Sequence, residues 1–397
     1  RGISHKNGRA SCPPGLSGLA ARGGYDIGQS ETRFRILRRL ETTDDPAISL
    51  LGKIPSELHH ENGSGLLELR PMRTTRQNRQ VATWLLICCA LVFAMVILGG
   101  VTRLTGSGLS MVDWRPLLGW LPPLTDTEWQ RVFEMYQQSP EFQKINSHMD
   151  VHDFKGIFWL EYLHRLLGRL IGIAFAVPFL VFAIRGYFRA GDIPKYLLMF
   201  TLGGFQGLLG WYMVKSGLVN NPEVSQYRLT AHLVTAFIIY GFMFWVALSL
   251  LYRRDSDQSH PWLKRSVLLT ALIGTTIVSG GFVAGLKAGL IYNTFPLMGD
   301  SLIPPGLLAL EPAWRNAFDN ITTVQFNHRL LALTTFALVI AFWWFGRAAG
   351  FTGRARTAST ALLVVATLQV GLGIATILNG VPIALAAAHQ AVAMLLL

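Results

Sequence analysis

Long apolar segments are the feature that most limits what this chain can fold into. About 20 mostly apolar residues let a helix cross a bilayer, and 51% of the 397 residues are hydrophobic while 15% are charged. Candidate segments lie at residues 81–101, 157–184, 195–214, 229–252, 264–285, 326–346, 357–379 and 382 onward. The pattern predicts an all-α polytopic membrane protein with eight transmembrane helices. We expect a truncated last helix, since its run stops at Leu397, and a clipped N-terminus, since the chain begins with Arg1.

Residues 1–80 are basic and differ from the apolar remainder. In the first forty positions, eight Lys or Arg side chains oppose only Asp26 and Glu31. A leader that contains Arg and Ser and few acids is typical of mitochondrial transit peptides. We therefore expect a largely disordered mitochondrial targeting region; the alternative is a disordered basic tail that binds anionic lipid. The formal net charge of +12 needs no nucleic-acid partner to explain it, because much of it lies in this leader and in loops on one side of the membrane.

Basic side chains also gather in alternate loops. They precede the first predicted helix and join helices two and three, four and five, and six and seven: Arg70, Arg73, Arg76, Arg79, Arg185, Arg189, Lys195, Arg253, Arg254, Lys264, Arg265, Arg347, Arg354 and Arg356. The positive-inside rule then predicts that the N-terminus faces the matrix. Cys12 lies in the leader, and Cys88 and Cys89 lie in the first helix, so no outer-loop disulfide is expected and no cysteine pattern indicates a metal site.

Polar residues within the helices indicate an internal repeat. Four features recur in the same order at offsets of 181, 164, 163 and 157 residues: Gly99-Gly100 with Gly280-Gly281, EYLHR at 161–165 with QFNHR at 325–329, Gln206 with Gln369, and Ala231-His232 with Ala388-His389. Each copy has four helices, so both enter the membrane from the same side and the pseudo-twofold axis follows the membrane normal. We predict bundles at 81–252 and 264–397 joined by a linker at 253–263. The outer loop at 102–156 contains a helix that opens with a capping box at Thr125–Glu128 and lies over the first bundle.

Four of the ten histidines lie in predicted spanning helices, and the repeat pairs them: His164, His232, His328 and His389. Each comes early in an even-numbered helix, which places all four at similar depth near the outer side. Two facing imidazoles in a four-helix bundle form an axial pair for haem iron. Gly168 and Gly172 follow His164 at helical spacing and leave room for a flat macrocycle, and alanines follow the other three histidines at i+4.

Other interpretations of the histidines are open. A single intramembrane histidine is usually a packed or water-facing polar residue, and the symmetric set of four argues against this. Zinc would need more ligands than two nitrogens in each bundle. His148 and His152, spaced i, i+4 in the outer loop, could bind a metal or could form a solvated face.

Charged side chains beside the histidines suggest further roles. Arg165 and Arg329 each follow a histidine, and Arg103 follows Gly99-Gly100; each could pair with a haem propionate or extend to lipid headgroups. Glu161 stands where the second half has Gln325. A carboxylate one turn before a histidine could move protons or stabilise positive charge, which an amide cannot. Alternatively, Glu161 bonds Arg165 at i, i+4.

Several sequence blocks together resemble the haem A synthase family of cytochrome oxidase assembly enzymes, in its mitochondrial form. The blocks are EYLHR, GGVTRLTGSGLSMVDW, GLLGWYMVKSGL with VSQYRLTAHL, AGLKAGLIYNTFPLMGD, VQFNHR and LQVGLG. The resemblance runs from about Val81 to the end of the chain. The leader and the matrix-side loops carry none of it.

The resemblance implies an oxidoreductase that converts the C8 methyl of haem O to the formyl group of haem A. It implies that His328 and His389 hold a prosthetic haem b, that His164 and His232 hold the haem being oxidised, and that Glu161 is the essential acid. Haem O synthase and a matrix ferredoxin are partners expected from the family, and an oligomer is compatible with it. Some bacterial relatives carry a cysteine pair in an outer loop, which this sequence lacks.

Two other functional classes fit parts of the pattern. A di-haem b-type membrane electron carrier would explain the histidines but not the difference between Glu161 and Gln325. A transporter built on parallel repeats would explain the repeat and would be colourless. Haem content and the effect of replacing Glu161 separate the three classes.

Overall fold

The protein is built from long α-helices in a computed structural model that describes residues 75–113, 120–219, 222–252 and 261–397. These residues all belong to one compact unit, Leu69–Leu397. Within the described ranges the structure contains no strand, only an isolated bridge between Met298 and Ser301. The expected all-α class is therefore confirmed. The predicted leader up to residue 74 and most of the predicted linker lie outside the described residues.

Seven helices in the described part of the chain are long and apolar enough to cross a membrane. They are α2 (Thr75–Leu104), α4 (Val151–Ile184), α5 (Ile193–Gly217), α6 (Gln226–Leu251), α7 (Leu263–Gly285), α9 (Ile321–Ala348) and α10 (Gly353–Leu378). The eighth predicted segment forms a shorter apolar helix, α11 (Ile383–Leu395). All eight apolar segments are helical, and the chain is a multi-pass membrane protein; the full crossing by the eighth remains a prediction.

Large apolar side chains cover the outer faces of these helices. Trp245 and Leu268 are each 70% exposed and Trp344 is 64% exposed. Contiguous apolar surface of this kind is rare in soluble monomers. In a bilayer the same side chains face hydrocarbon, which is where the composition predicts them.

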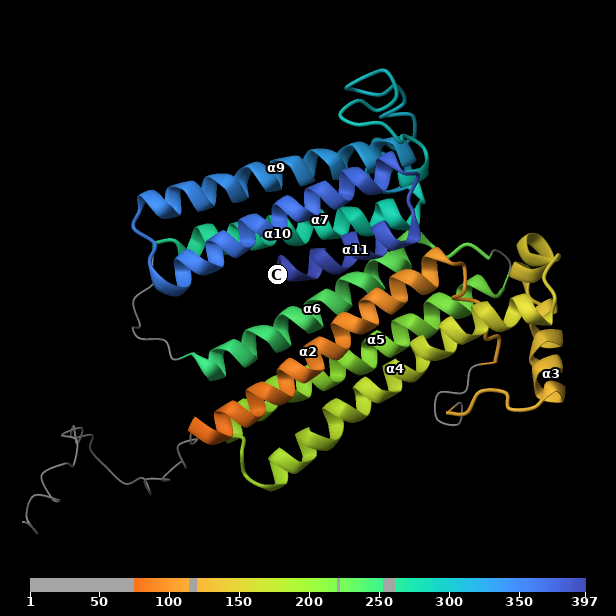
Figure 1. Ribbon diagram of the computed structural model, residues 1–397, viewed down its shortest axis with the longest axis horizontal. Coiled ribbons are helices and arrows are strands. Elements are labelled where there is room, and N and C mark those ends of the chain that lie inside the picture. The colour runs from red at the N-terminus through yellow and green to blue at the C-terminus, as the bar shows by residue number, and fades with distance from the viewer. Residues whose placement is uncertain (1–74, 114–119, 220–221, 253–260) are drawn as a thin grey trace, which may run out of the picture. The chain divides into compact units, whose positions relative to one another are not determined.

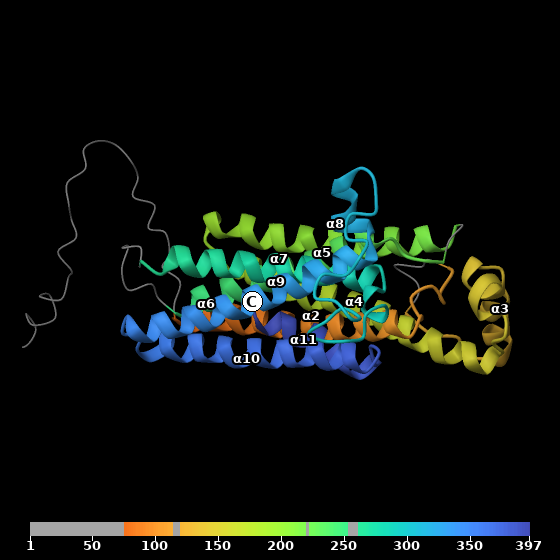
Figure 2. The same cartoon turned by 90° about the horizontal axis from the view of Figure 1, so that it is seen from above.

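The helices pack in two groups, and Figure 1 shows them apart: α2, α4, α5 and α6 in one and α7, α9, α10 and α11 in the other. Seen from above in Figure 2, the long helices of both groups run in roughly the same direction. In the first group α2 packs against α4 and α6, and α5 packs against α4 and α6. In the second group α9 packs against α7 and α10, and α10 packs against α11. The two groups contact each other through two helix pairs: α6 packs on α7, and α11 packs on α2. Each group thus uses its first and fourth helices to contact the other.

The outer loop folds against the start of α4. Thr125 caps α3 (Asp126–Gln137) and forms the predicted capping box with Glu128. Asp150 and Asp153 form a second capping box, so α4 begins at Val151, six residues before the apolar run. The extra turns carry Phe154, whose ring stacks on Tyr136 of α3 at 5.0 Å between centroids. The two capping boxes therefore build a platform at the end of the first group where α3 is labelled in Figure 1.

Candidate functional site

Glu161 is a buried carboxylate on α4, only 2% exposed. The Ser110 hydroxyl and the Met111 backbone N–H each donate to Glu161 Oε2 at 2.7 Å. Both donors come from the segment that follows α2, which folds back over α4. Arg165, one turn along α4, donates to Glu161 Oε1 from Nε at 3.0 Å and also from Nη2. Four donors thus hold a charged group in an apolar region, and such charge-assisted hydrogen bonds are the strong ones.

The guanidinium of Arg165 is shared between that carboxylate and the loop above it. Its Nη2 donates to the Met111 carbonyl oxygen at 2.8 Å, and its Nη1 donates to the Asp113 carbonyl oxygen at 3.4 Å. The i, i+4 pairing that we considered for Glu161 and Arg165 is therefore present. Four of the five N–H groups of Arg165 are thus directed at Glu161 and at the loop carbonyls.

The second group has a neutral version of this arrangement. Gln325, 1% exposed, donates from Nε2 to the Tyr292 carbonyl oxygen at 3.2 Å. Arg329 donates to the carbonyl oxygens of Tyr292 at 2.8 Å and Thr294 at 2.9 Å. Gln325 Oε1 and Arg329 Nε are buried without a hydrogen-bond partner. Buried polar atoms are rarely left unpaired, so this end of the second group has unused capacity for a polar or anionic ligand.

Each of the four intramembrane histidines lies directly against a glycine of the preceding long helix. A Cβ added to that glycine would lie 2.9–3.1 Å from the histidine Cε1. The pairs are His164 with Gly99, His232 with Gly210, His328 with Gly280, and His389 with Gly373. At Gly99 and Gly373 the distance is 2.9 Å, closer than real Cβ atoms approach, and at Gly210 and Gly280 it is 3.1 Å, tighter than nine in ten real contacts. The absent side chains therefore make room for the imidazoles. We call these four residues the seat glycines.

Glutamines stand beside one histidine in each group. Gln206 Nε2 lies 3.4 Å from His232 Nε2 and donates to the His232 carbonyl oxygen at 2.9 Å. Gln369 Nε2 lies 3.4 Å from His389 Nε2, and the His389 Nδ1 lies 3.1 Å from the Gln369 carbonyl oxygen. We used these glutamines only as markers of the repeat and did not predict them as site residues. Their equivalent positions in the two halves were the signal that could have found them.

Three of the four intramembrane histidines have a ring nitrogen without a hydrogen-bond partner in the protein. The Nδ1 atoms of His164, His232 and His328 are buried and accept or donate no hydrogen bond. Burying a polar atom unpaired costs free energy. A metal bound at an imidazole nitrogen would satisfy such an atom, since either ring position can be a metal ligand.

Comparison with known proteins shows the family of the chain. A family model described as cytochrome oxidase assembly protein, COX15-CtaA, matches residues 82–397. The chain belongs to the COX15-CtaA family. It is 54% identical over 336 residues to a protein named heme A synthase from Nitrosospira multiformis, covering 82% of this chain and 94% of the relative.

Eukaryotic members of the COX15-CtaA family are also similar. The chain is 44% identical over 352 residues to heme A synthase COX15 of Mus musculus, covering 86% of this chain and 84% of the relative. It is 44% identical over 330 residues to heme A synthase COX15 of Arabidopsis thaliana, covering 80% and 72%. The resemblance noted in the sequence is thus confirmed at the level of the family.

The histidines of this family member fit haem better than a tetrahedral metal ion. His164 and His232 lie on α4 and α6 of the first group, and His328 and His389 lie on α9 and α11 of the second. Each group thus offers two imidazoles, which is the axial set of a bis-histidine haem. In the described ranges no three His, Cys, Asp or Glu side chains gather as a zinc site would require.

The remaining predicted residues are more dispersed. Arg103 is half-buried in the last turn of α2, near Gly99. His148 lies in the turn before α4 and His152 in the first turn of α4, and both are exposed. Cys88 and Cys89 are buried free thiols within α2, so they form no disulfide in an outer loop.

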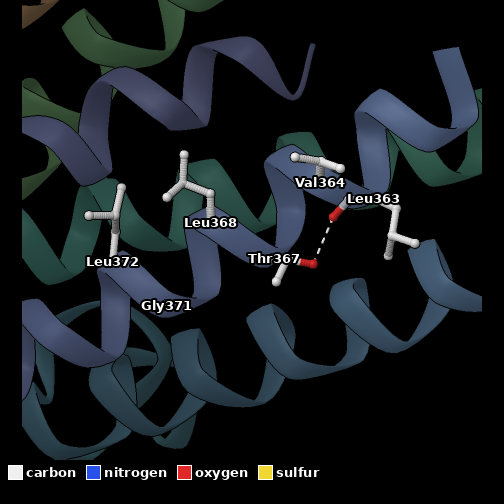
Figure 3. A pocket seen from close by; sticks show the side chains of 6 residues that line it. All are labelled: Leu363, Val364, Thr367, Leu368, Gly371 and Leu372. Atoms are coloured by element: carbon white, nitrogen blue, oxygen red, sulfur yellow. Dashed lines mark hydrogen bonds between the residues drawn. The ribbon is translucent and has the colours of Figure 1, made fainter. Parts of the chain in front are cut away.

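A hollow lies on the surface of α10. It measures about 620 Å³ and is lined by Leu363, Val364, Thr367, Leu368, Gly371 and Leu372. Figure 3 shows Thr367 donating back to the Leu363 carbonyl oxygen of its own helix, at 2.8 Å. The hollow is open and almost wholly apolar, as a lipid-facing surface of a spanning helix is.

A second buried carboxyl group lies in the outer platform. Glu141 is 6% exposed and accepts a hydrogen bond from the Tyr136 hydroxyl at 3.1 Å. Asn146, in the π-helical turn Phe142–Asn146, donates to the same hydroxyl at 2.8 Å. Burial raises the pKa of Glu141 to about 7, the Tyr136 hydrogen bond opposes the rise, and the nearby charge of Glu161 adds to it.

This pKa predicts a pH-dependent stability of the platform. Below pH 4.5 Glu141 is neutral in both the folded and unfolded chain, whereas between pH 4.5 and 7 the unfolded chain loses the proton first. Folding stability therefore falls across that window by up to about 3 kcal/mol. In thermal unfolding, Glu141→Gln should become stabilising relative to wild type as pH rises from 5 to 8. The exposed Glu134→Gln on α3 is the control, and equal pH profiles for the two variants would contradict the prediction.

Proposed function

We propose that this chain oxidises the C8 methyl of haem O to a formyl group and so makes haem A for cytochrome c oxidase. The proposal rests on four intramembrane imidazoles, each seated on a glycine, in a chain whose relatives named heme A synthase are similar over most of their length. Two pairs of axial ligands are what an enzyme needs if it carries one haem as a cofactor and takes a second as its substrate.

The two groups have different roles in this proposal. His328 and His389 would hold haem b, which when bound supplies one-electron redox chemistry. His164 and His232 would hold the haem substrate, because Glu161 lies one turn from His164 where the second group has Gln325. The division into bundles at 81–252 and 264–397 follows the repeat, and the four repeated glycine–histidine contacts support it.

Glu161 is the residue we assign to chemistry. Conversion of a methyl to a formyl group is a four-electron oxidation that adds one oxygen atom, so it needs an electron acceptor and an oxygen source from outside the chain. The protons that leave with the electrons need a base, and a fixed carboxylate one turn from His164 can accept them. Arg165 and the Ser110 hydroxyl hold that carboxylate in one orientation. Gln325 stands at the equivalent position of the second group and cannot take this role, which agrees with an electron-carrying function there.

The arginines divide between positioning and ligand binding. Arg165 already donates hydrogen bonds to Glu161 and to the loop carbonyl oxygens. Its main role in this proposal is therefore to position Glu161, and binding of a propionate is its second role. Arg329 pairs with carbonyl oxygens and keeps a buried, unpartnered Nε, which makes it the better propionate partner. Arg103, half-buried at the end of α2, is the third candidate.

The cellular setting is proposed from sequence and relatives. We place the chain in the mitochondrial inner membrane with its N-terminus in the matrix, since the leader is basic and eukaryotic relatives are similar. Haem O synthase would supply the substrate, and a matrix ferredoxin would exchange electrons with the haems. The oligomeric state is open.

A di-haem electron carrier is the second candidate function. Its supporting observation is that Glu161 is fully engaged by Ser110, Met111 and Arg165, as a purely structural carboxylate would be. This function needs the histidines but no substrate.

Extraction of haem from the purified full-length protein tests both candidates. A synthase should yield haem B together with haem O and haem A on chromatography, and a Soret band on the intact protein. Haem B alone would favour the electron carrier. A colourless protein would contradict both and leave the transporter interpretation.

A further inference from the structure

Contacts between the two helix groups converge on the histidine sites. Gly99 seats His164, and the adjacent Gly100 on α2 receives Gln390 from α11 of the other group. Gly280 seats His328, and the adjacent Gly281 on α7 receives Thr230 from α6. In each glycine pair, the first residue therefore contacts a histidine of its own group, and the second contacts a side chain of the other group.

The contact between α11 and α2 is polar and direct. Gln390 Nε2 donates to the Val96 carbonyl oxygen at 2.7 Å. A Cβ on Gly100 would lie 2.9 Å from Gln390 Oε1 and 3.1 Å from Nε2. Only the absence of a side chain at position 100 lets the amide reach the main chain of α2. Interhelical hydrogen bonds at small residues are a common way to hold membrane helices together.

The reciprocal contact between α6 and α7 is a close backbone approach. A Cβ on Gly281 would lie 2.9 Å from Thr230 Cγ2, and a Cβ on Gly285 would lie 2.5 Å from the Gln226 Cα. Gly281 and Gly285 have the spacing of the small-residue motif that brings membrane helices together. Gln226 and Tyr227 add hydrogen bonds at 2.8 Å to Asp319 of α8 (Asn316–Asp319). On this side of the interface the helices touch at Gly281 and Gly285, and the hydrogen bonds lie at the first turn of α6.

We infer that Gln390 is a positioning residue that couples the two haem sites across the interface. Its neighbour in sequence is His389, and its hydrogen-bond partner on α2 lies three residues before the glycine that seats His164. The amide therefore fixes the depth and rotation of α11 against the helix that supports the opposite site. Displacement at one site is transmitted through this contiguous contact to the other. The inference rests on the proposed haem binding.

The test uses Gln390→Met in the full-length, haem-loaded protein, because Met has a similar length but no amide. Low-temperature EPR spectra and midpoint potentials are measured separately for the two haems. We expect both haem signals to shift, and haem retention at His328 and His389 to weaken about three- to tenfold, as loss of one interhelical hydrogen bond predicts. Leu395→Met, at an exposed position on the same helix, should leave both signals in place.

Gly100→Ala provides an independent variant, since it keeps the amide and blocks its approach. If both changes act through one contact, the double variant should shift the signals no more than the larger single change. A shift confined to the haem at His389, or additive effects, would overturn the coupling while leaving haem binding intact. A wild-type protein without two haems would instead refute the proposed function.

Discussion

Replacing Glu161 with glutamine is expected to lower haem A formation by about a hundredfold or more, because positioned acid–base groups contribute about 10²–10⁴ to rates. The protein should keep its haem b, since His328 and His389 lie in the other helix group. Glutamine retains the size of the side chain and can still accept from Met111, but it removes the carboxylate. The measurement is chromatography of extracted haems, wild type beside variant, with the haem B content as the internal standard.

Ser110→Ala is the matched control for Glu161→Gln. Ser110 is 2% exposed and donates to the same carboxylate oxygen, so its loss weakens the link between loop and helix without removing the acid. A few-fold reduction in haem A is expected. Equal loss in the two variants would show that Glu161 acts only as a structural anchor, and full activity of Glu161→Gln would favour the electron carrier.

Replacing Gly280 with alanine should displace the His328 imidazole and weaken the axial site of haem b. The added Cβ would lie 3.1 Å from His328 Cε1, and forcing an extra carbon into a packed interior typically costs about 1–3 kcal/mol. This corresponds to about five- to hundredfold weaker haem retention. The readout is the fraction of low-spin b-type haem in the absorption and EPR spectra, with total protein measured independently.

Gly274→Ala is the control on the same helix, because a Cβ at that position meets nothing within 4 Å. It should retain the wild-type haem spectrum. Equal haem loss in the two variants would mean that α7 tolerates no alanine, and unchanged spectra in both would mean that Gly280 does not support His328.

The apolar runs were sufficient to locate every long helix in the described part of the chain. Lipid offers no hydrogen-bond partners, so a spanning segment forms its backbone hydrogen bonds within a helix and carries mostly apolar side chains. The ends were less well determined. The helix α4 begins at Val151 rather than at residue 157, since Asp150 and Asp153 form a capping box outside the apolar run. The same capping signal was recognised at Thr125 and confirmed there.

The sequence by itself determined the family, the helices and the candidate ligands, because the repeat makes four rare intramembrane histidines stand out. Tertiary structure decided how those side chains are held. That Gly99 supports His164, that Ser110 and Met111 bind Glu161, and that Gln390 reaches across to Val96 follow from the separation and rotation of neighbouring helices. Hydrophobic periodicity specifies which face of a helix is buried but not which residue of another helix it meets, and so these contacts could not be derived from the sequence alone.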